Sequence, residues 1–198
     1  MTRLLATIAG QEIYQKEDGS FSWISGLTVD GDGSPRCYGP GGLGLDYLAN
    51  AGSPGNWYGI LTDPEGEPYV QQSQDPAPGY YISTTSLQNR GYSATDPRRY
   101  LDSEAVPFVV MPGVLARHCS GIALGCRVEI EDTRSGTLVS AVCGDLGPDH
   151  HLGEASIAVA KKLGLNPSPK TGGSDEPVFL FTFWPGVAAD GFTLQPLG

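Results

Sequence analysis

Long hydrophobic runs are missing from this sequence, and so is any surplus of basic residues. No apolar stretch approaches the roughly 18 residues that a membrane-spanning helix needs, so no membrane partner is expected. Lysine and arginine total 12 against 22 acidic residues, which makes the formal net charge −10 at pH 7. Because phosphate backbones are bound by basic surfaces, this balance argues against a nucleic-acid partner and suits a cationic substrate.

Cysteine is scarce as well. The four cysteines are too few for a disulfide-built scaffold of 198 residues, and none follows the Cys-x-x-Cys spacing of structural zinc sites. Glycine and proline, by contrast, number 28 and 16 and are spread along the whole chain. This composition predicts a single mainly-β domain with many short strands and structured loops.

The first ten residues form only a short apolar patch with one basic residue, which is less than the core of a usual signal peptide. We expect them to belong to the fold as a first strand. Three alternatives stay open for the location of the protein: the cytoplasm, export by another route, or a sequence recorded without its leader.

Residues 125–131 and 137–143 are typical of a β-hairpin with one apolar face. The register of this hairpin places Cys126 opposite Cys143. A cross-strand disulfide and two buried thiols both fit that pairing, and a bridge from Cys126 to Cys119 would exclude it.

Other segments show strand or helix signals. Strands are predicted at 21–24, 26–29, 58–62, 69–72, 79–86, 106–112 and 177–185, a helical turn at 45–51, and a helix at 155–163.

Two acidic residues stand out between the hairpin and the predicted helix. Asp145 follows the apolar strand at 138–143, and Glu154 precedes the helix at 155–163, with glycines and a proline between them forcing a tight turn. Such a loop can aim both carboxyls into one cleft, and two carboxyls flanking a scissile bond are the usual equipment of a glycoside hydrolase. In the alternative interpretation, Asp145 caps a turn, and Glu154 lies in the first helical turn because the helix dipole favours an acidic residue there.

Signals for metals and cofactors are weak. His118, His150 and His151 match no ligand spacing, and residues 30–33 resemble only half of a calcium loop. We therefore expect no metal and no cofactor. Four aromatic residues are candidate platforms for sugar rings: Trp57, Tyr58, Tyr80 and Tyr81.

Several segments taken together resemble the family 75 glycoside hydrolases, the fungal-type endo-chitosanases. They are residues 28–33, 45–52, 78–85, 96–102, 106–112, 144–148 and 153–158. The resemblance maps the two essential acids of that family onto Asp145 and Glu154. One departure is Gly125-Cys126, where the family commonly carries Gly-Asp. The acidic segment is also similar to double-psi β-barrel proteins, which include expansin-like domains and rare-lipoprotein-A lytic transglycosylases.

The resemblance implies a mainly-β fold: a six-stranded double-psi β-barrel with long decorating loops and one or two short helices. It implies one catalytic domain over 1–198, in which residues 1–57 decorate the barrel and residues 58–198 form its core with a catalytic loop at 144–156. An extracellular location and a monomer are also expected.

The implied activity is endo-hydrolysis of β-1,4-linked glucosamine in chitosan or a related amino-sugar polysaccharide, with inversion. By position Glu154 is expected to be the acid and Asp145 the base. A helix N-terminus at Glu154 would favour its ionised form, so the reverse assignment stays open. Asp30, Asp32 and Asp46 would hold the ammonium groups of the substrate. Two rivals remain: a peptidoglycan-cleaving enzyme such as a muramidase or lytic transglycosylase, which would suit an antibacterial toxin, and a non-catalytic expansin-like wall-binding module.

Overall fold

The computed structural model describes residues 2–197, apart from the side chains of residues 116–118, so His118 lies outside the described side chains. The strands are β1 (Arg3–Ile8), β2 (Gln11–Gln15), β3 (Phe21–Asp30), β4 (Gly52–Ser53), β5 (Asn56–Trp57), β6 (Phe108–Pro112), β7 (Cys126–Asp132), β8 (Thr137–Gly147), β9 (Glu154–Ser156) and β10 (Ser174–Ala188). The α-helices are α1 (Gly113–His118) and α2 (Ile157–Lys162), and short 3₁₀ turns lie at Pro40–Gly42, Leu48–Ala51 and Pro97–Arg99. None of these described helices is long and apolar enough to cross a membrane.

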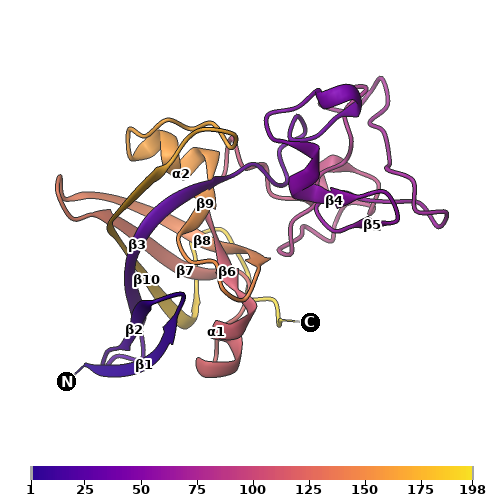
Figure 1. Ribbon diagram of the computed structural model, residues 1–198. Coiled ribbons are helices and arrows are strands. Elements are labelled where there is room, and N and C mark those ends of the chain that lie inside the picture. The colour runs from indigo at the N-terminus through magenta and orange to yellow at the C-terminus, as the bar shows by residue number, and fades with distance from the viewer. Residues whose placement is uncertain (1, 198) are drawn as a thin grey trace.

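Six of the strands close into a barrel (Figure 1). The order is β3-β10-β7-β8-β6-β9, and β9 pairs back with β3 to complete the circle. Two pairs, β3 with β9 and β6 with β8, are parallel, and the rest are antiparallel. The β1–β2 hairpin continues the sheet beyond β3. The predicted mainly-β fold, with a six-stranded barrel and two short helices, is confirmed.

Aromatic side chains from β3 and β10 fill much of the barrel interior. Trp23 stacks on Phe181 and Phe183 at centroid distances of 5.4 and 5.2 Å, and Phe21 stacks on Phe183 at 5.2 Å. All four are essentially inaccessible to solvent. Burial of each such ring stabilises the fold by roughly 1.5–3 kcal/mol, so this stack holds β3 firmly against β10.

The predicted hairpin register is confirmed. Strands β7 and β8 pair with Asp132 opposite Thr137 and continue in step to Arg127 opposite Val142. The thiols of Cys126 and Cys143 lie in hydrogen-bond contact and are not joined in a disulfide.

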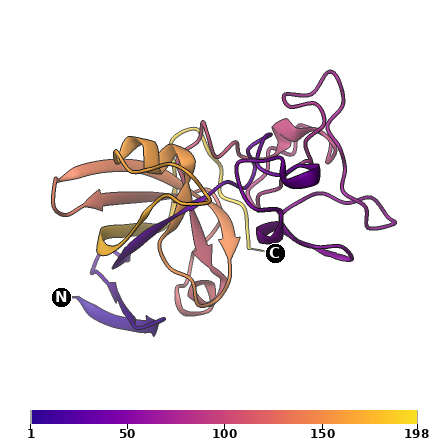
Figure 2. The same cartoon turned by 45° about the horizontal axis from the view of Figure 1, so that its top comes forward.

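The predicted division of the chain at residue 57 is wrong. Strand β3 forms part of the barrel wall, whereas residues 31–107 leave the barrel at its end and return at β6 (Figures 1 and 2). We call residues 31–107 the loop lobe. The strands expected at 58–62, 69–72 and 79–86 are only single bridges there. Glycines and prolines interrupt this segment, whereas β3 has ten residues without a proline and can pair along its length with β10.

The loop lobe has its own small core, formed by Cys37, Tyr38, Ala51 and Ile60. The lobe lies beside the end of the barrel where β3 finishes. Hydrogen bonds from the Leu87 amide to the Gly144 carbonyl and from the Ala158 amide to the Ser103 carbonyl join it to β8 and α2. The 3₁₀ turn Leu48–Ala51 corresponds to the helical turn expected at 45–51.

The local structure around Glu154 differs from the prediction. Glu154 opens strand β9, and helix α2 begins only at Ile157, with the Ser156 hydroxyl accepting a hydrogen bond from the Val159 amide as its N-cap. The β3–β9 pairing draws residues 154–156 into extended conformation, which overrides the helical signal of the following residues. Glu154 therefore gains no stabilisation from a helix N-terminus.

Candidate active site

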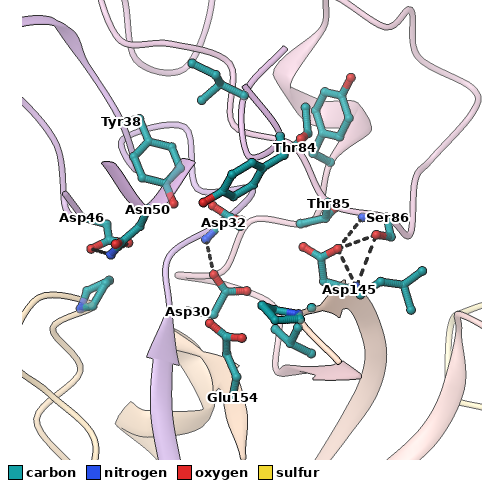
Figure 3. Close-up of a pocket in the computed structure, with 18 of the residues that line it drawn as sticks. Asp30, Asp32, Tyr38, Asp46, Asn50, Thr84, Thr85, Ser86, Asp145 and Glu154 are labelled. Carbon is teal, nitrogen blue, oxygen red and sulfur yellow. Dashed lines mark hydrogen bonds between the residues drawn. The ribbon is translucent and has the colours of Figure 1, made fainter. Parts of the chain in front are cut away.

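A cleft of about 980 Å³ lies between the end of the barrel and the loop lobe. Five carboxyl groups line it: Asp30, Asp32, Asp46, Asp145 and Glu154. Figure 3 shows them converging on one space from both parts of the molecule. The structure thus brings together all five acidic residues that the sequence singled out.

Asp145 reaches the cleft through an irregularity in β8. Val109 of β6 pairs with Cys143, but the next residue, Val110, pairs with Asp145, so Gly144 is left over. A Cβ atom at Gly144 would lie 2.6 Å from the Cβ of Phe108, so only glycine fits there. Extra residues of this kind re-aim the side chain that follows them.

Three hydrogen bonds hold the Asp145 carboxyl in place. Its Oδ1 accepts bonds from the Ser86 amide at 2.9 Å, the Ser86 hydroxyl at 2.5 Å and the Leu146 amide at 2.7 Å. Only 7% of Asp145 is exposed, and this burial raises the pKa of its carboxyl, while the three hydrogen bonds oppose that rise. The ionised form of Asp145 is therefore supported by three donors.

Glu154 has a contrasting environment. It lies beside Thr28 in the parallel β3–β9 pairing, and no donor in the described part of the chain reaches its carboxyl. Burial, followed by the negative charges of Asp145 and Asp46, raises the pKa of Glu154 to about 7. A carboxyl with such a pKa can hold a proton at neutral pH and release it to a substrate.

Strand geometry sets the spacing of Asp145 and Glu154. They lie on β8 and β9, which pair with β6 on its two sides. Val110 of β6 pairs with Asp145, and Val109 pairs with Ala155, the residue after Glu154. Two strand spacings separate their backbones by roughly 9–10 Å. Side chains that start from backbones this far apart and reach into one cleft can lie on opposite sides of a bond.

Asp30 and Asp32 lie at the end of β3 and just beyond it. One carboxylate oxygen each from Asp30, Asp32 and Asp145 lies within 4.8 Å of the others. Burial and the neighbouring negative charges raise the pKa of both Asp30 and Asp32 well above its usual range, although a hydrogen bond from Tyr38 opposes the rise at Asp32. Oxygens at this spacing could bind a hard cation such as Mg²⁺ or Ca²⁺. Carboxyl groups that share protons lie equally close together, so we assign no metal here.

Asp46 lies on the other side of Tyr38 from Asp145 (Figure 3). The Asn50 amide donates to both of its oxygens at 3.0 Å, and the Tyr47 amide donates at 2.7 Å. Only 7% of Asp46 is exposed, so this carboxylate is held rigidly at the wall of the cleft.

The aromatic candidates are placed differently from the acids. Trp57 and Tyr81 pack against the small core of the loop lobe, and neither they nor Tyr80 lines the cleft. Tyr58, 68% exposed, and Tyr100 lie along the cleft instead. Trp57, Tyr80 and Tyr81 therefore offer no ring surface to a ligand in this cleft.

The sequence did not single out Ser86, Tyr38 or Asn50, which hold three of the acids in place. Nothing in the local sequence marks Ser86, because its partner Asp145 is 59 positions away. His151 also lines the cleft, with its Nε2 atom 3.3 Å from the Thr28 hydroxyl.

Comparison with protein-family models and with curated proteins finds no match to this chain. The resemblance to family 75 glycoside hydrolases thus stays a prediction.

Proposed function

We propose that this protein is an inverting glycoside hydrolase that cleaves β-1,4-linked glucosamine polymers such as chitosan. The observation that carries the proposal is the pair Asp145 and Glu154: both line one open cleft, from strands on either side of β6, in opposite environments. Inverting enzymes use carboxyls roughly 6.5–9.5 Å apart, which leaves room for a water molecule.

The two environments support different roles. Glu154, with a pKa of about 7 and no described donor, acts as the general acid that protonates the leaving oxygen. Asp145, which accepts three hydrogen bonds, acts as the base that takes a proton from the attacking water. The sugar at the cleavage point lies between them.

The charge of the cleft supports an amino-sugar substrate. Five carboxyl groups line it, and no arginine or lysine in the described part of the chain does so. Buried carboxyls of this kind favour a ligand that brings positive charge, because ammonium groups relieve their mutual repulsion. The rigid Asp46 carboxylate is the best placed to bind one ammonium group away from the cleavage point. Peptidoglycan, whose sugars carry no ammonium groups along the backbone, would leave this repulsion in place, and a non-catalytic module has no need of an acid held near neutrality.

The test compares hydrolysis of chitosans of graded acetylation with hydrolysis of purified peptidoglycan. We expect release of reducing ends from the least acetylated chitosan. Because the mechanism inverts the β-linkage, proton NMR should show the α-anomer of the new reducing end first. Asp145→Asn and Glu154→Gln should each lower kcat by roughly 10²–10⁴-fold while the fold remains intact by circular dichroism.

Glu65→Gln, at an exposed position that does not line the cleft, is the matched control and should retain the parental rate. Near-parental turnover in the Asp145 or Glu154 variant would refute the assignment. Cleavage of peptidoglycan but not of chitosan would mean that Asp145 and Glu154 act on the rival substrate.

A further inference from the structure

Asp30 lies closer to Glu154 than its place in the sequence suggests. The parallel β3–β9 pairing aligns Thr28 with Glu154 and Asp30 with Ser156. Figure 3 shows the carboxyl groups of Asp30 and Glu154 facing each other at the floor of the cleft. One Asp30 oxygen accepts a hydrogen bond from the Asp32 amide at 2.8 Å, and no described group donates to the other oxygen.

The surroundings of Asp30 do not suit a negative charge. It is only 8% exposed, and acidic groups face it from three directions: Asp32 from the following loop, Asp145 from β8 and Glu154 from β9. The nearby Cys37 thiol is uncharged because its own pKa is raised by burial. No ion pair in the described part of the chain involves Asp30. Carboxyls this close together cannot all ionise, and a carboxyl with few donors is the one that retains a proton. Asp30 accepts one hydrogen bond, whereas Asp145 accepts three.

We propose that Asp30 is a positioning residue that remains a neutral carboxylic acid and donates a hydrogen bond to Glu154 as Glu154 gives up its proton. This inference rests on the proposed function. In the cleavage step the water oxygen forms a bond to the anomeric carbon, and the bond from that carbon to the leaving oxygen breaks. The Glu154 proton moves to the leaving oxygen, one water proton moves to Asp145, and Asp30 keeps its own proton throughout. A donor aimed at the carboxylate that forms on Glu154 stabilises the transition state more than the ground state.

The role differs from the ammonium-binding role expected from the resemblance, because that role needs an ionised Asp30. Asparagine has the shape of the neutral acid and can still donate a hydrogen bond, but it carries no charge. Leucine has the same branched arrangement of side-chain heavy atoms and removes the donor. The pair Asp30→Asn and Asp30→Leu therefore separates the two roles.

We expect Asp30→Leu to lower kcat on chitosan by roughly 10- to 100-fold with little change in KM, as for loss of one hydrogen bond to a charged group. Asp30→Asn should lose less than about tenfold, since its amide replaces the donor. The same substitutions at exposed Asp175 control for surface effects, and thermal unfolding of each variant checks the fold. An equal loss of kcat in both Asp30 variants, or a rise in KM as the main effect in Asp30→Asn, would overturn the proposal.

An infrared comparison tests the protonation state without relying on activity. At neutral pH the wild-type protein should show the absorption of one more protonated carboxyl group than Asp30→Asn does, and identical absorption would overturn the proposal. Loss of wild-type activity in EDTA, with recovery on adding Mg²⁺, would overturn it too, because carboxylates that hold a cation are ionised. If the wild type cleaves neither polymer, the proposed function fails, and the infrared comparison still decides whether Asp30 holds a proton.

Discussion

Replacement of Glu154 by glutamine should make the protein more stable at alkaline pH. The pKa of Glu154 is raised from 4.5 in the unfolded chain to about 7 in the folded protein. A carboxyl whose pKa is higher in the folded state binds more protons when folded, so the free energy of unfolding falls as pH rises. The contribution is complete below about pH 4.5 and is lost as pH rises through about 7.

The magnitude follows from the size of the shift. Each pKa unit corresponds to about 1.36 kcal/mol, so the shift at Glu154 costs about 3 kcal/mol of stability above neutral pH. Glutamine has nearly the same shape and does not ionise, so Glu154→Gln avoids this cost. For a chain of this size the gain corresponds to roughly 6–12 °C in melting temperature at alkaline pH, with little difference in acid.

Urea or thermal unfolding of both proteins across the range from acid to alkaline pH measures this effect. The other buried acids are present in both proteins, so the difference between the two curves reports the ionisation of Glu154 together with its charge interactions with Asp30 and Asp32. Glu65→Gln, in an exposed turn, should give a curve parallel to that of the wild type. If the Glu154→Gln curve also stays parallel, Glu154 does not hold a proton in the folded state, and its assignment as the general acid loses its physical basis.

Three further predictions concern the support of the site. Gly144→Ala should destabilise the fold by roughly 1–3 kcal/mol in urea unfolding and lower activity, because its methyl group would lie 2.6 Å from the Cβ of Phe108. Ser86→Ala removes one of the three hydrogen bonds to Asp145, so the pKa of Asp145 should rise and the acid limb of the kcat/KM profile should move up by roughly one pH unit. Asp46→Ala should raise KM for chitosan roughly tenfold and change kcat less, as steady-state kinetics would show, because it removes a carboxylate remote from the cleavage point.

Local patterns predicted the parts of the fold that depend on neighbouring residues. The β7–β8 hairpin has the predicted register, since its turn and alternating face leave one pairing that keeps the apolar side chains together. The buried strand at 106–112 and the last strand at 177–185 are present as β6 and β10.

Distant pairings account for what local patterns missed. Strand β3 pairs with β9, more than 120 positions later, and this pairing makes Glu154 extended and brings Asp30 to it. In the same way Ser86 meets Asp145 across 59 positions. No short-range signal marks either contact, because both arise only when the barrel closes.

The amino-acid sequence alone determined that this protein is a mainly-β, acidic domain, and it singled out Asp145 and Glu154 as candidate catalytic acids. Strand alternation and turn residues act over a few positions, so they can be read directly. Only the tertiary structure decided which carboxyls share a cleft and which environments they have. Proton affinity depends on burial and on neighbouring charges, and both are set by side chains that meet through the closed barrel and the loop lobe beside it.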